Sequence, residues 1–377
     1  TLVVWARSTG KRRNDFMNAT IKDIAKRTGL GLATISSYLN GGNVREKNRV
    51  KIEEAIKELN FEVNEVARGL KTNRTKMIGI IIPEMNNTFF AEIITEAEDI
   101  LRSHGYATMI CDCRSDAKRE KEAADFLFHR RVDGLIIMPT GPARISLERF
   151  VESGRPIVMI DRKRDEISCD CVLVDNDGAA RDAVERLIHA GHRKIGMIEG
   201  PEDVYTTKER RRGYKTALEN AGIIPEERLI VKGNYTIAGG AAAMRKLRND
   251  NPDMTAVFVS NYEMTVGAMM EINDLGISVP EELSVIGFDN IDFAKAAVPR
   301  LSIVTQPTKE IACEAAAVLL QRLDERSGKT LSVPSAHLLD SSSGNSHNVK
   351  IIKLKTKFME GRSIKKLEDP AAESEEK

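Results

Sequence analysis

Cysteine, aromatic residues and long apolar runs are all scarce in this 377-residue chain. Its five cysteines, at positions 111, 113, 169, 171 and 313, are odd in number and lack the C-x₂₋₄-C spacing of zinc sites, so neither a disulfide framework nor a structural metal is expected. The two C-x-C pairs lie inside apolar runs, which predicts that these thiols pack in strands. No apolar run approaches the roughly 20 residues that cross a membrane. Together with the lack of a leader-like segment, this predicts a cytoplasmic protein with reduced thiols.

The chain also lacks net charge, at +1 overall, but its charge is unevenly distributed. Residues 1–76 hold 16 Lys+Arg and 8 Asp+Glu, a net of +8, which leaves −7 for the rest. A basic head on an acidic body is typical of a protein in which only the head meets nucleic acid.

Residues 20–40 of this head read as a helix-turn-helix. Apolar side chains recur at helical spacing over 21–28, and the glycines at 29 and 31 allow a tight turn. A second helix is expected over 32–39, with the small residues Ala33, Ser36 and Ser37 on its outer face. Such a helix can lie deep in the major groove, although a plain surface hairpin remains an alternative for this stretch alone.

Three further segments complete the expected head. Residues 50–59 have a helical period, so a headpiece over 19–62 is predicted. Residues 64–70 (NEVARGL) form a short helix that is marginal by itself, which makes 63–76 the natural hinge. Residues 1–18 show no clean period and are expected to be a disordered extension, with Met17 a candidate start.

From residue 77 onward, apolar runs alternate with amphipathic helical stretches. Ten strand-like runs are found at 78–83, 107–111, 134–138, 157–160, 171–174, 194–198, 228–231, 256–259, 283–287 and 301–304. Continuous apolar strands between helices indicate parallel sheets covered on both faces. The alternation of strands and helices starts again near residue 175, which indicates two doubly wound lobes. We expect lobe one at about 77–172 and 305–330, lobe two at about 173–304 and 331–360, an edge strand at 349–358, and an acidic tail at 361–377. The cleft between the lobes is the expected binding site.

These segments together resemble the lactose/galactose repressor (LacI-type) family of bacterial transcriptional regulators over residues 19–329. The resemblance is carried by TIKDIAKRTG, ATIS, VARGLKTNRTKMIGIIIP, RVDGLI, GHRKIG, ERRRGY, EMTVGAM, VPEELSVIGFDN and the Gln306-Pro307 pair. It implies a multidomain fold: an all-α helix-turn-helix headpiece, a hinge helix, and an α/β two-lobed effector domain like the periplasmic sugar receptors. It also implies a homodimer on near-palindromic double-stranded operator DNA.

The resemblance assigns roles to headpiece and hinge residues. It implies base contacts at Leu32, Ala33 and Ser37, backbone-facing places at Thr34, Ser36 and Asn40, a further DNA contact at Thr20, and a minor-groove wedge at Leu70 with Ala67 and Asn64 beside it. Thr34 and Ser36 could instead be plain helix surface. The chain departs from the family at three positions, with Ser37 for a frequent Arg, Gly31 for Ser and Val63 for Pro. Because Ser37 cannot make a bidentate guanine contact, an unusual operator is expected.

For the cleft, the resemblance implies effector contacts at Phe89, Phe90, Asp161, Arg162, Arg210, Tyr262 and Asp289. Aromatic faces with charged hydrogen-bonding groups suit a sugar or sugar derivative, and a nucleoside is possible. Tyr262 stands where sugar-binding members commonly have Asp, and the two arginines would suit a negatively charged ligand. The alternatives are lobe core for the two phenylalanines and a structural ion pair for Arg210 and Asp289.

The motifs point away from enzyme chemistry. The chain has no phosphate loop, and no Ser-His-Asp or Cys-His set falls on family-matched positions. His189 and His192 lie at a helix-to-strand junction in this family, so no metal or cofactor is expected. The leading prediction is a repressor controlled by a small ligand. A two-lobed transport receptor, or a regulator controlled mainly by a partner protein docked on lobe one, are the alternatives.

Overall fold

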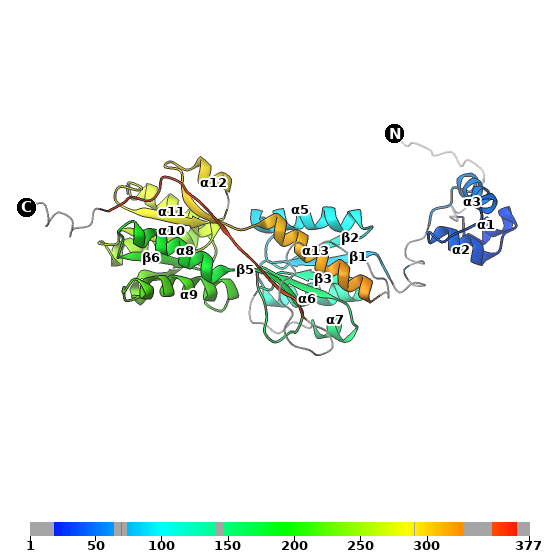
Figure 1. Cartoon of the computed structure of the whole chain (residues 1–377), viewed down its shortest axis with the longest axis horizontal. Helices are drawn as coiled ribbons and strands as arrows, with labels where there is room; N and C mark the ends of the chain where they lie inside the picture. The colour runs from blue at the N-terminus through cyan, green and yellow to red at the C-terminus, as the bar shows by residue number, and fades with distance from the viewer. Residues whose placement is uncertain are drawn as a thin grey trace, which may run out of the picture. The chain divides into compact units, whose positions relative to one another are not determined.

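The structure is a computed structural model that describes residues 19–63, 69, 74–140, 147–289, 291–326 and 349–367. It divides into two compact units, residues 1–75 and 76–377 (Figure 1). The expected extension at 1–18 and most of the hinge, including Asn64, Ala67 and Leu70, lie outside the described residues.

The headpiece is a three-helix unit: α1 (Ile21–Thr28), α2 (Leu32–Leu39) and α3 (Glu46–Glu58). Its small core is built on Ile24, Ile35, Ile52 and Ala55, all buried. The turn between α1 and α2 begins at Gly29 with φ of 70°, a backbone conformation that glycine adopts without steric cost. The third helix starts at Glu46, four residues before the predicted start at residue 50. The prediction missed its first turn because the residues there are polar and show no apolar period.

The first lobe is a six-stranded parallel sheet in the order β11-β5-β4-β3-β1-β2. Helices α5 and α13 cover one face, while α6 and α7 cover the other. The elements are β1 (Met77–Ile82), α5 (Thr88–Ser103), β2 (Ala107–Asp112), α6 (Ala117–His129), β3 (Gly134–Ile137), α7 (Glu148–Glu152), β4 (Ile157–Ile160), β5 (Asp170–Val174), α13 (Thr308–Glu325) and β11 (Ile351–Leu354).

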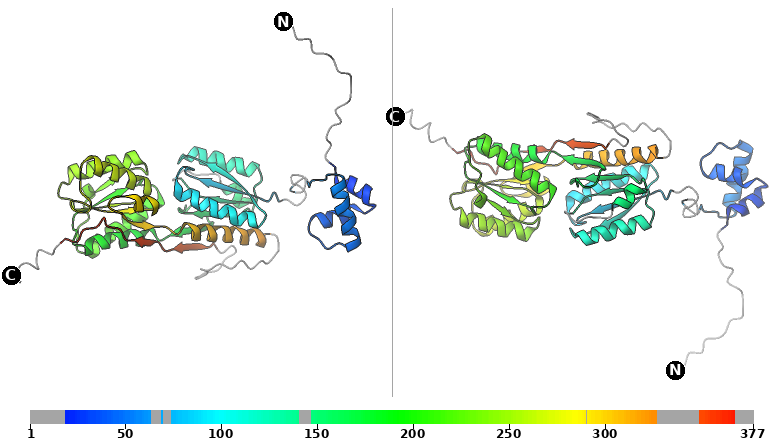
Figure 2. Two further views of the ribbon diagram at one scale, coloured as in Figure 1. Left: turned by 90° about the horizontal axis from the view of Figure 1, so that it is seen from above. Right: turned by 90° about the horizontal axis from the view of Figure 1, so that it is seen from below.

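The second lobe repeats this plan in the order β12-β10-β9-β8-β6-β7, with β12 antiparallel to β10. Helices α8 and α9 cover one face, and α10, α11 and α12 cover the other (Figure 2). The elements are α8 (Asn176–His189), β6 (Ile195–Glu199), α9 (Tyr205–Asn220), a 3₁₀ turn (Glu227–Leu229), β7 (Ile230–Lys232), α10 (Ile237–Asp250), β8 (Ala256–Val259), α11 (Tyr262–Asp274), β9 (Ser284–Phe288), α12 (Ile291–Ala296), β10 (Ser302–Thr305) and β12 (Lys357–Met359).

The chain passes between the lobes three times, after β5, after β10 and after β11. The ten predicted strands and the two-lobed α/β class are confirmed. The third crossing corrects the expected boundaries: residues 349–358 are not one strand of lobe two. Instead β11 pairs with β5 in lobe one and β12 pairs with β10 in lobe two, because the apolar alternation of these residues does not specify a partner sheet.

Two other boundaries differ from expectation. Lobe one extends through Val174 at the end of β5, beyond the expected 172. Residues 361–367 are not a free tail but cross lobe two, where Ser363 is buried and the Leu367 amide donates to the Ala190 carbonyl at 2.8 Å. Backbone hydrogen bonds hold this segment against the lobe, and the apolar pattern of the sequence does not predict such bonds.

The predicted packing of the cysteines in strands holds in part. Cys111 and Cys171 lie in β2 and β5, while Cys113 and Cys169 lie one residue outside these strands. Cys113, Cys169 and Cys171 are buried in the core cluster beneath α6 and α7, and Cys111 is half-buried. Within the described ranges, none of the helices is long and apolar enough to span a bilayer.

Candidate DNA-binding surface and interlobe site

The exposed start of α2 is the candidate DNA-reading surface. Leu32, with 47% of its surface exposed, and Ala33 are both accessible. Thr34, Ser36 and Ser37 are half-buried along the same helix. An exposed large apolar side chain beside small ones is the type of surface that contacts thymine methyl groups.

Two other predicted DNA contacts already have hydrogen-bond partners in the headpiece. The Thr20 hydroxyl and amide both donate to the Asp23 carboxylate, at 2.7 and 2.8 Å, which fixes the start of α1 and lowers the pKa of Asp23. The Asn40 amide donates to the Ser36 carbonyl at 2.7 Å and ends α2. Any DNA contact by these two residues is therefore made by atoms already oriented within the headpiece.

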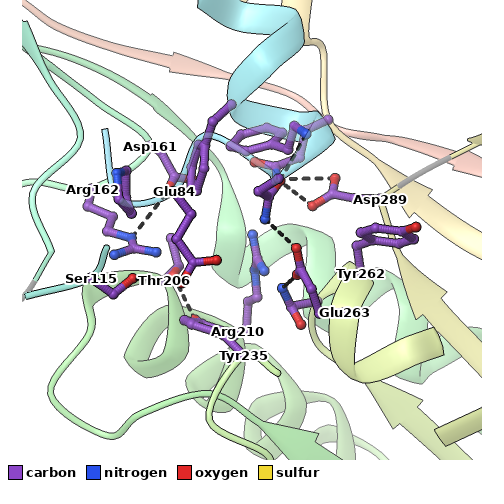
Figure 3. Close-up of a pocket in the computed structure, with 16 residues that line it drawn as sticks. Glu84, Ser115, Asp161, Arg162, Thr206, Arg210, Tyr235, Tyr262, Glu263 and Asp289 are labelled. Carbon is purple, nitrogen blue, oxygen red and sulfur yellow. Dashed lines mark hydrogen bonds and ion pairs between the residues drawn. The ribbon is translucent and has the colours of Figure 1, made fainter. Parts of the chain in front are cut away.

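The second candidate site is a cavity between the two lobes of residues 76–377, about 50 Å³ in volume. It is small because the lobes are close together, and it admits only a few waters. Both lobes contribute to its lining, which is mainly polar (Figure 3): Pro83, Glu84, Asn87, Phe89, Phe90, Ser115, Asp161, Arg162, Thr206, Arg210, Tyr235, Asn261, Tyr262, Glu263, Asp289 and Gln306.

The fold explains why these residues meet. They follow the carboxyl ends of parallel strands, where a doubly wound sheet places its binding crevice. Asp161, Tyr235 and Asp289 each stand just beyond a strand with φ of 65°, 56° and 61°. This left-handed region costs about 1–3 kcal/mol for a residue with a side chain, so its recurrence at one cavity supports this cavity as the candidate binding site.

In the first lobe, Asp161 and Arg162 form a buried pair. The Arg162 Nε donates to the Asp161 carboxylate at 3.2 Å, and Nη1 donates to the Pro139 carbonyl at 3.1 Å. Phe89 and Phe90, at the start of α5, pack edge to face with ring centroids 5.3 Å apart. Both rings belong to the lobe core and also line the cavity. Packing in the core and contact with a ligand are therefore compatible roles for these two residues.

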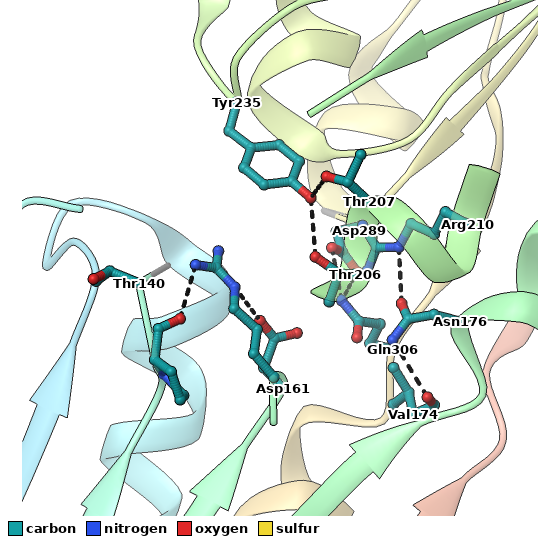
Figure 4. Close-up of polar contacts among 12 residues, drawn as sticks. Thr140, Asp161, Val174, Asn176, Thr206, Thr207, Arg210, Tyr235, Asp289 and Gln306 are labelled. Atoms are coloured by element: carbon teal, nitrogen blue, oxygen red, sulfur yellow. Dashed lines mark hydrogen bonds and ion pairs between the residues drawn. The ribbon is translucent and has the colours of Figure 1, made fainter. Parts of the chain in front are cut away.

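In the second lobe, Arg210 on α9 is buried and held by protein acceptors (Figure 4). Its Nε donates to Asn176 at 2.8 Å, its Nη1 donates to the Ser260 carbonyl at 2.5 Å, and its guanidinium lies 3.7 Å from the centre of the Phe288 ring. The Tyr235 hydroxyl bonds to the hydroxyls of Thr206 and Thr207 at 2.9 and 2.7 Å.

Asp289 is the most perturbed acid of the cavity. Burial raises its pKa to about 7, Asp161 and Glu263 add to this effect, and Arg210 opposes it. The carboxylate accepts two hydrogen bonds from the Gln306 amide, at 2.9 and 3.1 Å. The hydrogen bonds of Asp289 and Arg210 are therefore made with other residues, rather than in the structural ion pair considered above.

Three contacts join the lobes around the cavity. The Asn87 amide, from lobe one, donates to Glu263 of lobe two at 2.5 Å. Two cations of lobe one, Arg162 and Lys163, each lie 5.8 Å from the ring centre of a second-lobe tyrosine, Tyr235 and Tyr205 respectively. The arrangement is a closed one held by polar contacts that a ligand could replace.

Comparison with known proteins follows the same division of the chain. Residues 20–64 match the family model described as bacterial regulatory proteins, lacI family, and residues 184–342 match the periplasmic binding protein-like domain. The transcriptional repressor CytR of Escherichia coli K12 is 34% identical over 309 residues, covering 81% of this chain and 90% of CytR. The chain belongs to the lacI family. It is a DNA-binding transcriptional regulator.

Solved structures of the lacI family agree with this assignment. The cellobiose complex of the regulator CelR matches with a TM-score of 0.67 and 28% identity, covering 92% of this chain and all of that one. The operator-bound lac repressor dimer has a TM-score of 0.76 at 22% identity, covering 92% of this chain and 99% of its own, and shows the shared fold. A headpiece of this kind leaves the transport-receptor alternative without support.

All seven effector residues named from the sequence line the one cavity: Phe89, Phe90, Asp161, Arg162, Arg210, Tyr262 and Asp289. Nine other lining residues were not predicted from the sequence: Pro83, Glu84, Asn87, Ser115, Thr206, Tyr235, Asn261, Glu263 and Gln306. Their common signal was available, since most of them closely follow a predicted strand. Polar residues at strand ends are frequent, however, and only the folded lobes show which of them face the cleft.

Proposed function

We propose that this lacI-family regulator is a repressor that binds a near-palindromic operator as a homodimer, and that a sugar or sugar derivative in the interlobe cavity controls its affinity for DNA. The observation that carries the proposal is the cavity itself, to which both lobes contribute hydrogen-bonding and aromatic side chains. A ligand that contacts both lobes binds one lobe arrangement better than the other and so shifts their equilibrium.

Related proteins support the ligand class. CelR was solved with cellobiose, and a lacI-family regulator from Enterococcus faecium that is 25% identical to this chain was solved with ribose. On the DNA side, we propose base contacts by Leu32, Ala33 and Ser37, phosphate-side contacts by Thr20, Thr34, Ser36 and Asn40, and a minor-groove contact by Asn64, Ala67 and Leu70. Because its proposed target is operator DNA, we place its action in the cytoplasm, at the nucleoid. We expect no enzymatic reaction, since the related proteins are transcriptional regulators.

Genomic selection with the full-length protein, followed by footprinting, tests the DNA half of this proposal. The expected result is protection of a site with approximate two-fold symmetry. A thermal-shift screen of sugars, sugar acids and nucleosides, repeated in gel-shift titrations with each ligand that binds, tests the other half. Failure to retard any DNA at low salt would reject the repressor proposal. Operator binding that responds to no small molecule would favour control by a partner protein instead.

A further inference from the structure

The charges that line the interlobe cavity are unbalanced. Four carboxylates face it, Glu84 and Asp161 from the first lobe and Glu263 and Asp289 from the second, against the guanidinium groups of two arginines (Figure 3). In a partly enclosed space, like charges that lack countercharges repel one another strongly. The cavity is therefore poorly suited to an anion and has an excess of negative charge.

The two arginines donate most of their observed hydrogen bonds to acceptors within the protein. Arg162 donates to Asp161 and to a backbone carbonyl, and Arg210 donates to the Asn176 amide oxygen and to another backbone carbonyl. Only one of the four acids, Asp161, receives an ion pair from them. Binding of an anionic sugar at these arginines would bring its charge against the remaining carboxylates.

The other three acids are hydrogen-bonded to neutral donors. Glu263 accepts from the amides of Asn87 and Asn261, Asp289 from the Gln306 amide, and Glu84 from the Ser115 hydroxyl at 3.4 Å. Across the described residues, no Lys or Arg forms an ion pair with any of these three carboxylates. Burial raises the pKa of Glu263, and the Glu84 carboxylate adds to that effect from the opposite lobe.

An unused acceptor points in the same direction. The Gln306 amide oxygen is buried and has no hydrogen-bond partner in the described part of the chain, while its amide nitrogen is held by Asp289. An unpaired buried oxygen costs about 1–3 kcal/mol, which a ligand donor would recover. With the carboxylates, it makes the cavity rich in acceptors and suited to a ligand rich in donors.

A metal ion would be another possible countercharge. Over the residues that the structure describes, no three His, Cys, Asp or Glu side chains are grouped so as to hold one. An organic ammonium group needs fewer carboxylates in direct contact, because its three hydrogen bonds can also be donated to neutral amide and hydroxyl oxygens, in directions that adjust to these acceptors.

We propose that the effector is a polyhydroxylated ring compound bearing an ammonium group, such as an amino sugar, and that this group binds among Glu84, Glu263 and Asp289. Its hydroxyls donate to the remaining acceptors, including the free Gln306 oxygen, and its ring packs against Phe89, Phe90 and Tyr262. The proposal rests on the proposed function of the cavity and narrows its ligand class. Because the carboxylates come from both lobes, the ammonium group also holds the lobes together.

Isothermal titration of the full-length protein at about pH 7.5 tests this proposal with matched ligands. The panel pairs glucosamine, galactosamine and mannosamine with the corresponding neutral hexoses, N-acetyl derivatives and uronic acids. At least one amino sugar is expected to bind at least about tenfold more tightly than its neutral and acidic counterparts, since hydrogen bonds to charged groups contribute about 1.5–3 kcal/mol. Equal or tighter binding of the neutral or acidic counterparts, or no amino-sugar binding at all, overturns the proposal.

Variants locate the ammonium group. Asp289→Asn and Glu263→Gln keep the size of each side chain, remove its charge and exchange one acceptor oxygen for an NH2 donor. Each is expected to weaken amino-sugar binding at least about tenfold more than it weakens any neutral-sugar binding. Asp292→Asn, an exposed acid on α12, is the matched control and is expected to change neither. Gel-shift titration of the same preparations separates the two levels of inference. If the unmodified protein binds operator DNA but does not prefer amino sugars, only the proposed ligand class is rejected. If the unmodified protein binds no operator DNA, the proposed function itself is rejected.

Discussion

Asp289 combines two unfavourable features at a single position. Its backbone has φ of 61°, and its carboxyl group is held near other acids with a pKa raised to about 7. Either feature alone lowers stability, so their coincidence in a cavity indicates a residue retained for binding. The stability of the ligand-free protein should therefore depend on the protonation of this residue.

The sign of this dependence follows from the two pKa values. The unfolded chain releases the Asp289 proton near 3.8, whereas the folded chain keeps it to about 7, so stability falls as pH rises between these values. The groups that face the carboxylate are Arg210, Gln306, Asp161 and Glu263. We predict that the melting temperature of Asp289→Asn, measured relative to that of the unmodified protein, increases as pH rises from about 5 to about 8. Differential scanning calorimetry across this range measures the difference.

The control for this measurement is Asp292→Asn, which makes the same substitution at an exposed position outside the cavity lining. A difference for Asp289→Asn that stays constant with pH would mean that Asp289 ionises at an ordinary pKa and that the cavity does not crowd its charge. Asp289 was identified from the sequence by its place after the IGF strand end. Its partner Gln306 was visible only as part of the Gln306-Pro307 motif, because a hydrogen bond between the ends of two neighbouring strands depends on their register.

At the scale of elements, the start of α5 both begins a helix and joins the lobes. The Asn87 side-chain oxygen accepts from the Phe89 amide at 2.9 Å, which caps α5, while its amide nitrogen reaches Glu263 across the cavity. One side chain therefore contributes to helix stability through one atom and to lobe closure through the other. These two roles can be separated by substitution.

We predict that Asn87→Ala lowers the stability of the body by roughly 1 kcal/mol, the usual cost of losing a cap, and also weakens closure. Asn87→Asp retains a capping oxygen but places a carboxylate against Glu263. It should keep stability close to that of the unmodified protein and still favour open lobes. Thermal melts report the first effect, and small-angle scattering of the full chain reports the second. Equal scattering from the unmodified protein and Asn87→Asp would show that this contact does not hold the lobes together.

The segment at 361–367 shows what an element can do without secondary structure. The Ser363 hydroxyl accepts from the Ser302 amide at 2.8 Å and donates to the Val285 carbonyl at 2.6 Å. Nearby, the buried His192 ring contacts the Lys365 carbonyl through Nε2 at 3.1 Å and the Thr255 hydroxyl through Nδ1 at 2.9 Å. Because a carbonyl only accepts, Nε2 carries the proton, and burial lowers the pKa of this neutral imidazole.

Ser363→Ala removes both hydroxyl bonds inside the second lobe. We predict a loss of about 1–3 kcal/mol in the free energy of unfolding, because buried backbone groups lose their partners. Urea denaturation measures the loss, and the exposed Lys366→Ala is the matched control, expected within about 0.5 kcal/mol of the unmodified protein. Equal stability of the two variants would mean that the segment is only loosely attached to the lobe.

At the scale of the whole molecule, the parts that could be predicted are those with a repeating pattern. Alternating apolar runs and amphipathic helices specify doubly wound lobes, so the strands were identified at close to their true bounds. The assignment of β11 and β12 to different sheets and the docking of 361–367 could not be predicted in this way. They depend on which distant backbone groups lack partners, and a local sequence pattern does not contain that information.

The division of charge between the two units provides the last prediction. Residues 1–76 carry a net +8 and the remainder −7, and the cavity is acidic, so we expect phosphate binding to be confined to the headpiece and hinge. If a dimer neutralises about six phosphates, operator affinity should fall on the order of 10³-fold between 50 and 200 mM salt.

Fluorescence anisotropy with labelled operator measures this slope, and titration of the effector across the same salt range serves as the internal control. An ammonium ligand held by partly buried carboxylates is screened less than surface charges, so its affinity should change less than about tenfold. An effector affinity that falls as steeply as operator affinity would place the ammonium group on solvent-exposed carboxylates rather than in the cavity between the lobes.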